Sequence, residues 1–437
     1  MGQRTGLSIV NRPIPQKPLQ VEEEPAVHGN TRTAAIAWLV AAFCYFYQYV
    51  LRSSPSVMMP QLSDALGISA LAVASIVGLF YYGYAIFSLV AGAALDRLGP
   101  RKTLPIAAGV MGAGALLFAS SSSDAASVGR ILQGIGGAFA AVGAIYIASN
   151  SFPPSQAATL IGATQMFGMA GGAAGQFAVG PLIGRGVSPD RFWTVVGITG
   201  FAVGALLLVF LSPHRKTLDS RDWLKATTKP FYVVFKNPQS ILCGLIAGLL
   251  FIPTTIFDMI WGVRYLQDAH GVEYAAAVMR SATVPFGWII GCPLLGFISD
   301  RIGRRKPVII GAATLLLACL TWILFGPKGI LPIYSLGLLL GTASGAAMLP
   351  YTIIKEANPP QYGGTATGVI NFLNFTFSAL LGPVFALILH NVSGGTGTLE
   401  LAHYQTAFAP LLLGVAVAIA LTALLKETGP AARNMIS

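Results

Sequence analysis

The stretch GAALDRLGPRK, residues 92–102, recurs as GFISDRIGRRK at residues 296–306, an offset of 204 residues (92 to 296). A longer segment repeats at almost the same spacing, since SFPPSQAATLIGATQ (151–165) corresponds to ANPPQYGGTATGVIN (357–371). A third match is a pair of dipeptides, Gly180-Pro181 and Gly382-Pro383. Three anchors at a nearly constant offset predict two structural copies of one unit within a single chain.

The composition places these copies in a membrane. Of the 437 residues, 54% are hydrophobic and only 10% are charged, and the mean hydropathy is +0.68. Soluble domains carry about 25% charged residues, whereas apolar runs of roughly 20 residues are typical of transmembrane helices. Twelve such runs predict an all-α membrane protein: 34–60, 70–95, 103–121, 128–151, 157–184, 193–212, 240–263, 277–299, 306–326, 331–355, 363–390 and 405–425.

Loops and tails separate the predicted spans into two units of six. We expect a cytoplasmic N-terminal tail at 1–33 and a C-terminal tail at 428–437. The longest predicted loop, 213–239, joins the two helix bundles, and its segment HRKTLDSRDWLKATTKP suits a charged helix at the membrane surface. The bundles then span 34–212 and 240–427.

The net charge of +11 is distributed asymmetrically along the chain. Lys and Arg gather in alternate loops: Arg97, Arg101 and Lys102; Arg215, Lys216, Arg221, Lys225, Lys229 and Lys236; and Arg301, Arg304, Arg305 and Lys306. This bias predicts that these loops and both chain termini lie in the cytoplasm, as in a multi-pass protein of a bacterial inner membrane. A nucleic-acid-binding protein would instead gather its basic residues on a folded soluble face, so we exclude that class of partner.

The residue patterns give no support to an enzyme or a metalloprotein. The four cysteines lie far apart inside apolar runs, which predicts neither a metal site nor a disulfide framework. The five histidines are scattered without a Ser/His/Asp constellation, and the sequence contains no GxxxxGK[ST] loop for a nucleotide. We therefore expect no enzymatic activity, no metal and no cofactor.

The repeated loop resembles the most diagnostic motif of the major facilitator superfamily. The matching residues are Gly92, Asp96, Arg97, Gly99, Arg101 and Lys102 in the first copy and Gly296, Asp300, Arg301, Gly303, Arg304, Arg305 and Lys306 in the second. RILQGIGGA (130–138) is similar to the family's Arg-x-x-x-Gly motif in span four, whereas Pro100 departs from the pattern. The resemblance covers nearly the whole chain. It implies two pseudo-symmetric six-helix bundles around a central cavity, a monomer in the lipid bilayer, and secondary active transport by alternating access.

The motif loops also have a physical interpretation of their own. An aspartate at the end of one helix can accept hydrogen bonds from the N-terminus of a neighbour, while basic residues bridge across. Such a cluster stabilises one arrangement and must break in another, so we expect a conformational latch. Glu356 is expected to complete the second copy with Arg304 or Arg305, whereas Lys355 would extend to the cytoplasmic surface. Positive-inside anchoring alone explains the basic residues but not the repeated Asp and Gly.

Arg52 stands in an otherwise apolar stretch, YQYVLRSSPSVMMP at residues 47–60. It precedes Asp64 by 12 residues (52 to 64), about 18 Å of helix, and a charge at that depth is usually paired or functional. Gln48 and Tyr45 share its helix face. Span one of each half lines the central cavity in this superfamily, so the resemblance implies that Arg52 meets the solute and binds an anionic group.

Asp258 is the predicted counterpart in the second half. It lies 42 residues before Asp300 (258 to 300), as Arg52 lies 44 before Asp96 (52 to 96). We expect Arg52 and Asp258 to face each other across the cavity, with Asp258 carrying a proton or binding an ammonium group. The alternative is an ion pair that only holds the halves together. Uncharged residues of spans five and eleven complete the predicted substrate site: Gln165, Asn371 and Asn374.

Two further features of the first half concern its hydrogen bonds. Arg130 either extends to the outer surface or, as the resemblance implies, lies deeper, bonded to neighbouring helices and assisting proton movement. Pro55 has no amide hydrogen, so it leaves the carbonyl of Leu51 free for another partner.

The predicted solute is small, hydrophilic and anionic, with a carboxylate or a phosphate, and the expected coupling ion is H⁺. An amino acid or a short peptide stays open, because one arginine and one aspartate could clamp a zwitterion. A drug exporter and a non-transporting sensor on the same scaffold are further alternatives. The glycine-rich segment of span five fits close helix packing as well as an exporter motif.

Overall fold

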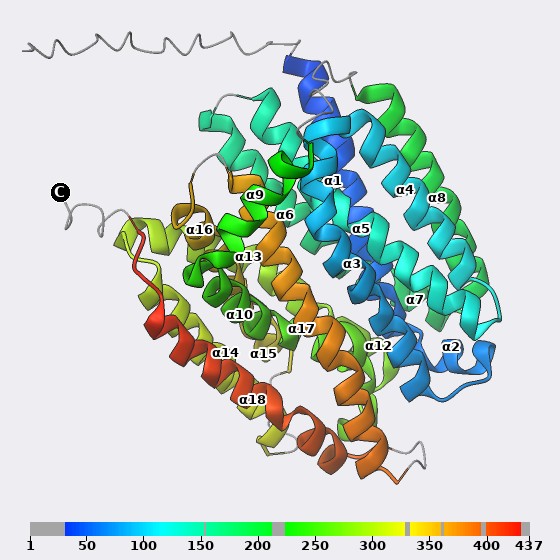
Figure 1. Ribbon diagram of the computed structural model, residues 1–437. Coiled ribbons are helices and arrows are strands. Elements are labelled where there is room, and N and C mark those ends of the chain that lie inside the picture. Colours follow the sequence, from blue (N-terminus) through cyan, green and yellow to red (C-terminus); the bar gives the residue numbers. More distant parts are fainter. Residues whose placement is uncertain are drawn as a thin grey trace, which may run out of the picture.

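The protein is helical throughout the residues that its computed structural model describes (Figure 1). These residues are 31–152, 154–211, 223–327, 333–359, 362–394 and 399–429. The side chains of Asp96 and Arg97 in the first motif lie outside the described part. So do most of the predicted N-terminal tail and the first residues of the predicted inter-bundle loop.

The first half occupies the blue-to-green part of the chain in Figure 1. Its elements are α1 (Thr31–Ser53), η1 (Ser54–Val57), α2 (Met59–Leu66), α3 (Ala70–Leu98), α4 (Pro100–Phe118), α5 (Ser123–Ser151), α6 (Pro154–Phe177), α7 (Val179–Gly184) and α8 (Pro189–Phe210). The helix α9 (Trp223–Lys236) follows within the predicted inter-bundle loop, and it packs against α17 of the second half.

The second half occupies the green-to-red part. Its elements are α10 (Pro238–Ile252), η3 (Pro253–Gly262), α11 (Val263–His270), α12 (Tyr274–Ser281), α13 (Thr283–Ile302), α14 (Lys306–Phe325), α15 (Ile333–Ser344), η4 (Gly345–Met348), α16 (Leu349–Glu356), α17 (Gly363–Val392) and α18 (Leu401–Leu424). Several predicted spans are therefore built from two or three short helices rather than one.

The two halves repeat one packing scheme. In the first, α5 packs against α3 and α4 against α8; in the second, α15 packs against α13 and α14 against α18. The halves meet where α3 contacts α17 and where α6 contacts α13. This arrangement confirms the prediction of two pseudo-symmetric helix bundles, which lie on opposite sides of the molecule in Figure 1.

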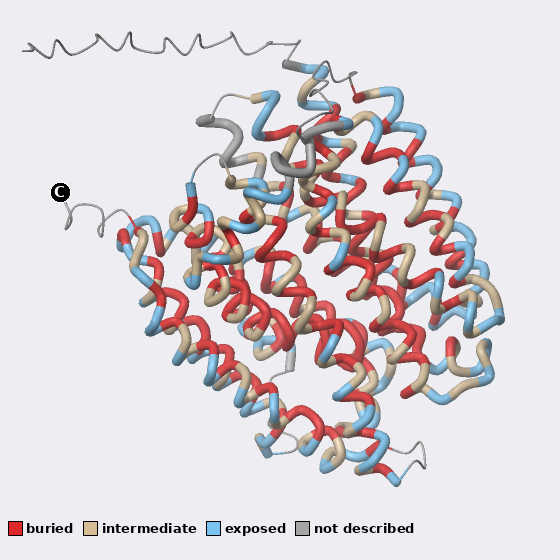
Figure 2. The backbone as a smooth tube through the Cα atoms, viewed as in Figure 1, coloured by how far each residue is buried: buried red, intermediate tan, exposed pale blue. Residues whose placement is uncertain are grey.

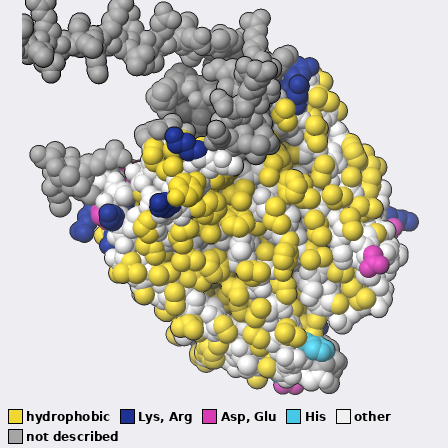
Figure 3. All heavy atoms as spheres, viewed as in Figure 1, with side chains coloured by type: hydrophobic (Ala, Val, Ile, Leu, Met, Phe, Trp, Pro, Cys, Tyr) yellow, Lys and Arg dark blue, Asp and Glu magenta, His cyan; other side chains and the backbone are white. Residues whose placement is uncertain are grey.

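The outer surface of the bundles suits lipid. Eleven helical segments of the described chain are long and apolar enough to cross a membrane, and α4 falls short because Arg101 and Lys102 in its first turn lower its mean hydropathy. Buried residues concentrate along the middle of the molecule (Figure 2), while apolar side chains cover most of the described face in Figure 3. Val209 is 73% exposed and Leu413 is 68% exposed. An apolar surface of this extent identifies a multi-pass membrane protein.

The first span of each half is interrupted beside its charged residue. The helix α1 ends at Ser53, just after Arg52, and continues as the 3₁₀ turn η1, which contains Pro55. The helix α10 gives way at Pro253 to the π-helix η3, which contains Asp258. Prolines break the regular hydrogen-bond ladder, and π-helical segments are frequent at functional sites.

Close helix contacts in the first half depend on glycine. A Cβ atom at Gly134 would lie 2.0 Å from the carbonyl oxygen of Phe80, whereas one at Gly78 would meet nothing within 4 Å. We expect Gly134→Ala to destabilise the protein by about 1–3 kcal/mol through overpacking. Gly78→Ala should leave stability unchanged or slightly raised, because alanine is the better helix former. Thermal unfolding in detergent, followed by tryptophan fluorescence, measures both; equal melting temperatures would contradict this account of the α3–α5 contact.

Candidate functional site

A central cavity of about 1110 Å³ lies between the two halves. Tyr45, Tyr49, Phe251 and Phe375 line its inner part. It extends toward the end of the molecule that carries the motif loops, which we call the basic end, where Asp300 belongs to the wall. This volume exceeds the few hundred Å³ of most small-molecule sites, so a solute and water fit together.

Four of the predicted substrate residues line this cavity: Tyr45, Gln165, Asn371 and Asn374. Gln48, which we expected on the same helix face as Tyr45, is instead fully buried against Gly137 of α5. Neither amide atom of its side chain has a hydrogen-bond partner in the described part of the chain. Buried polar groups normally have hydrogen-bond partners. The amide of Gln48, one helical turn from Arg52, is therefore an exception among the described residues.

A polar cluster forms the second-half wall of the cavity. The Tyr351 hydroxyl donates to Oδ1 of Asn371 at 2.7 Å and accepts from Nδ2 of Asn374 at 3.0 Å. Oδ1 of Asn374 is buried and has no partner among the described residues. Across the cavity, Nε2 of Gln165 lies 3.1 Å from Sδ of Met348. Hydroxyl and amide groups of this kind suit a hydroxylated solute.

Lys355 also lines the central cavity, one helical turn from Tyr351 on α16. We expected it to extend to the surface, and it does lie near the basic end, but within the cavity wall. Its side chain is exposed. A solvated ammonium group at this point would attract an anion toward the cavity.

Arg52 lies behind the inner wall of the cavity, enclosed by aromatic rings. Its guanidinium carbon is 4.9 Å from the ring centre of Tyr49, 5.2 Å from Tyr81, 5.1 Å from Phe251 and 5.0 Å from Phe375. Nε donates to the Tyr81 hydroxyl at 3.4 Å, whereas Nη1 and Nη2 have no partner in the described structure. The residue is 1% exposed. Thus Arg52 does not face the cavity directly in this conformation, because the rings of Tyr49, Phe251 and Phe375 stand between.

Asp258 is likewise absent from the cavity wall, which corrects our expectation that it faces Arg52. It is 3% exposed and accepts a hydrogen bond from the Ser281 hydroxyl at 2.8 Å, while Oδ2 has no partner in the described chain. It lines a separate cavity of about 40 Å³, shared with Arg280. The described ion pairs do not include Arg52 with Asp258. The ion pair that we considered as an alternative role for these residues is therefore not formed in this conformation.

Hydrogen bonds between the halves close the end opposite the basic end. The Tyr274 hydroxyl on α12 donates to the carbonyl of Val57 at 2.6 Å. Nε2 of Gln176 on α6 bridges Ser56 at 3.3 Å and Ser281 at 3.2 Å. Ser281 is also the partner of Asp258. The carboxylate is therefore connected through two hydrogen bonds to the contact that seals this end.

Arg130 lies deep in the first half, as one of our two interpretations required. It is 1% exposed, and Nη1 donates to the carbonyl of Leu51 at 3.0 Å, the group that Pro55 leaves free. Nη2 donates to the carbonyl of Val77 at 3.1 Å. Nη1 is also 2.6 Å from Oε1 of Gln133. Arg130 thus joins α1, α3 and α5 by hydrogen bonds to backbone that would otherwise be unsatisfied.

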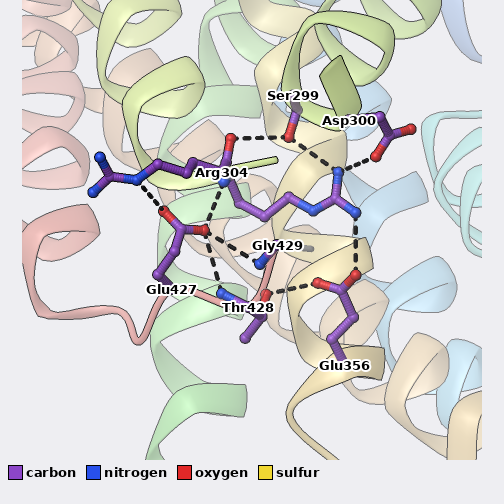
Figure 4. Close-up of polar contacts among 8 residues, drawn as sticks. Ser299, Asp300, Arg304, Glu356, Glu427, Thr428 and Gly429 are labelled. Carbon is purple, nitrogen blue, oxygen red and sulfur yellow. Dashed lines mark hydrogen bonds and ion pairs between the residues drawn. The ribbon is translucent and has the colours of Figure 1, made fainter. Parts of the chain in front are cut away.

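The second copy of the motif forms a charged cluster at the basic end (Figure 4). Arg305 pairs with Asp300 and, at 3.1 Å, with Glu356, one of the two contacts expected for that glutamate. Oε1 of Glu427 accepts from the backbone N–H of Arg305 at 2.6 Å, and Thr428 donates to Oε2 of Glu356 at 2.6 Å. The chain beyond α18 therefore belongs to the cluster, which the sequence did not predict.

The remaining motif residues have distinct surroundings. Gly99 and Gly303 have φ angles of 72° and 70°, so both copies use glycine at a position with a positive φ angle. Nη1 of Arg101 donates to the carbonyl of Leu211 at 2.8 Å. Gly92 lies beside Gly364 of α17, and Gly296 belongs to the cavity wall. Lys102 and Arg301 are exposed. Arg304 lies 3.9 Å from Glu427. The roles assigned to Asp96 and Arg97 lie outside the described residues.

The Arg305 contacts allow a matched test of the cluster. Its side chain is 8% exposed and joins two carboxylates, whereas neighbouring Arg301 is exposed. We expect Arg305→Gln to lower the free energy of unfolding by about 1–3 kcal/mol, because Glu356 loses its buried partner. Arg301→Gln should change it by less than about 0.5 kcal/mol. Thermal unfolding in detergent at neutral pH compares the two, and similar melting temperatures would argue against a stabilising cluster.

Sequence reasoning missed several residues that the structure brings together: Tyr49, Tyr81, Phe251, Tyr351, Lys355 and Phe375. Inside apolar spans, aromatic residues look like ordinary core. One signal was available, since the aromatic run YFYQY (45–49) ends three residues before Arg52. Rings near a buried arginine indicate cation–π contacts.

Comparison with known proteins now identifies the class. The family model of the Major Facilitator Superfamily matches residues 41–383. The chain belongs to this superfamily, and it is a membrane transporter rather than an enzyme.

The relatives of known function that match this chain share little sequence identity with it. The chain is 27% identical to a hexuronate transporter of Bacillus subtilis over 83% of this chain and 90% of that protein. It is 24% identical to a citrate–proton symporter of Salmonella typhi over 54% of this chain and 57% of that protein. Among solved structures, a bacterial homologue of the human lysosomal transporter Spinster, in an inward-facing and unoccupied conformation, superposes with a TM-score of 0.68 at 16% identity, covering 91% of this chain and 98% of that one.

Proposed function

We propose that the protein is a proton-coupled secondary transporter of small organic anions that works by alternating access. The observation that carries this proposal is Arg52, a buried cation beside the central cavity whose two Nη groups have no hydrogen-bond partner in the described chain. A guanidinium presents paired donors that match a carboxylate or a phosphate. An unsatisfied charge at this depth is usually functional.

The basic end is proposed to face the cytoplasm, with both termini on that side, because Lys and Arg favour cytoplasmic loops. The central cavity reaches the basic end, and Tyr274 and Gln176 hold the opposite end closed. The conformation is then open toward the cytoplasm. Alternating access requires these contacts to break while the cavity closes at the basic end.

Carboxylates that also carry hydroxyl groups fit the cavity best. Lys355 in the cavity wall and Arg52 behind it supply positive charge, while Tyr351, Asn371 and Asn374 supply groups that bond hydroxyls. The names of two relatives, a hexuronate transporter and a citrate–proton symporter, point to the same class of solute. An amino acid clamped between an arginine and an aspartate is less favoured, because Asp258 lines a separate small cavity and not the central one.

Asp258 is the proposed proton carrier. It is a buried carboxylate with one free oxygen atom and no ion-pair partner among the described residues. Buried acids within membrane spans commonly form part of proton pathways. Arg130 was the other candidate for this role, but its contacts to the carbonyls of Leu51 and Val77 favour a structural one.

Uptake by proteoliposomes tests the function. Purified protein should accumulate radiolabelled D-glucuronate, a hexuronate, when the exterior is acidic, and it should not accumulate D-glucose, which has the same ring without the carboxylate. Citrate and inorganic phosphate define the range of anions. Equal uptake of glucose and glucuronate, or uptake that ignores an imposed pH gradient, would refute the proposal.

A further inference from the structure

The four rings around Arg52 come from both halves of the protein. Tyr49 on α1 and Tyr81 on α3 belong to the first half, while Phe251 on α10 and Phe375 on α17 belong to the second. We call these four residues the aromatic cage. All four ring centres lie between 4.9 and 5.2 Å from the guanidinium carbon.

The aromatic cage surrounds the Arg52 guanidinium, where a buried cation would ordinarily have an anionic partner. No carboxylate in the described chain pairs with Arg52, and a buried charge without compensation is strongly unfavourable. The face of an aromatic ring is electronegative, so it attracts a cation placed above it. Four rings therefore compensate part of the charge that a bound anion would otherwise neutralise.

The cage is complete only in one relative position of the halves. The ring centre of Phe375 lies 4.3 Å from that of Tyr84, with the rings tilted, and 6.2 Å from that of Tyr81, with the rings parallel. Both contacts cross the interface between the halves. Phe251 contacts Phe375 at 5.6 Å. Rotation of the halves that closes the basic end must move Phe251 and Phe375 relative to Arg52, because these rings travel with the second half.

We propose that Phe251 and Phe375 are surrogate ligands of Arg52, which replace the solute anion in the conformation open at the basic end and so promote its release there. This inference rests on the proposed anion-binding role of Arg52. Rings that merely stacked on the solute would strengthen its binding, whereas surrogate ligands weaken it. The two roles therefore predict opposite effects when a ring is removed.

The test measures binding of radiolabelled D-glucuronate to purified protein, together with efflux from loaded proteoliposomes. We expect Phe375→Leu and Phe251→Leu each to lower the Kd about 3- to 10-fold and to slow efflux through the basic end, because the anion no longer competes with that ring. Trifluorophenylalanine at position 375 keeps the ring shape but removes its electronegative face, so it should act in the same direction even if a leucine variant folds poorly.

Two controls separate this effect from general packing. Phe385 lies on the same helix, α17, and stacks on Phe408 away from Arg52, so Phe385→Leu should leave the Kd unchanged. In the Arg52→Gln background, Phe375→Leu should give no gain in affinity. An unchanged or raised Kd in the cage variants, or an equal shift in Phe385→Leu, would overturn the inference.

The binding measurements also distinguish failure of the proposed function from failure of this inference. If wild-type protein binds neither D-glucuronate, citrate nor inorganic phosphate, then the anion-binding role of Arg52 is wrong and the surrogate role falls with it. If wild type binds one of them and the cage variants bind it equally well, only the surrogate role is wrong.

Discussion

Arg52→Gln is expected to weaken binding of carboxylate solutes about 100-fold while the protein still folds. The change removes two charge-assisted hydrogen bonds to the anion, each worth roughly 1.5–3 kcal/mol. The lower end of this range, about 3 kcal/mol for both bonds, corresponds to a factor slightly above 100 in Kd. It also removes a buried cation without a carboxylate partner, so stability should not fall. Equilibrium binding of D-glucuronate and thermal unfolding measure the two effects.

Two variants serve as comparisons for Arg52→Gln. Arg52→Lys keeps the charge but loses the planar pair of donors, so we expect an intermediate loss. Arg185→Gln changes an exposed arginine of the first half and should bind like wild type. A melting temperature that collapses in Arg52→Gln, with unchanged affinity in the molecules that remain folded, would make Arg52 a structural residue.

Asp258→Asn is expected to abolish proton-driven accumulation of the anion while exchange of labelled for unlabelled solute continues. Asparagine accepts the Ser281 hydrogen bond but does not exchange a proton, so the substituted transporter equilibrates its solute without using the pH gradient. We expect accumulation to fall by at least about 10-fold, which corresponds to the loss of a one-unit pH gradient as a driving force. Uptake and counterflow in the same proteoliposomes separate the two activities.

The matched control for Asp258→Asn is Glu273→Gln, which neutralises an exposed acid at the same end of the molecule. It should retain both accumulation and counterflow. Accumulation by Asp258→Asn that follows the pH gradient as in wild type would assign the coupling proton to another group. Loss of counterflow together with accumulation would instead show that Asp258 is needed for the conformational change itself.

The repeat allowed much of the fold to be predicted from the sequence. The two copies of the motif, at Gly92 and Gly296, define matching halves, and apolar runs indicated the spans. Breaks near Pro55 and Pro253 were also foreseeable, because proline interrupts helical hydrogen bonds. Other breaks could not be predicted from the sequence of a single span. The 3₁₀ segment η4 interrupts span ten, for example, although it contains no proline.

The relation between Arg52 and Asp258 was not predictable from the repeat. Counting residues back from Asp300 assumes a regular α-helix, but Asp258 lies within the ten-residue π-helix η3. A π-helix has more residues per turn than an α-helix, so side chains beyond Pro253 shift around the helix axis. Asp258 consequently meets Ser281 on α12 rather than the central cavity.

The aromatic cage was hidden from sequence reasoning for another reason. Its four rings lie on α1, α3, α10 and α17, and each is spaced like an ordinary core residue in its own span. Only the packing of both halves brings them to one guanidinium. The charged cluster at the basic end was partly predictable, because Glu356 and Arg305 follow the motif pattern, whereas Glu427 enters from the chain that follows α18.

An experimental structure of the protein with bound D-glucuronate tests the central claim most directly. The account predicts that the carboxylate lies within about 3 Å of Nη1 and Nη2 of Arg52, with Phe251 and Phe375 displaced from the guanidinium. A carboxylate held by Lys355 in the central cavity, with all four rings still around Arg52, would contradict it.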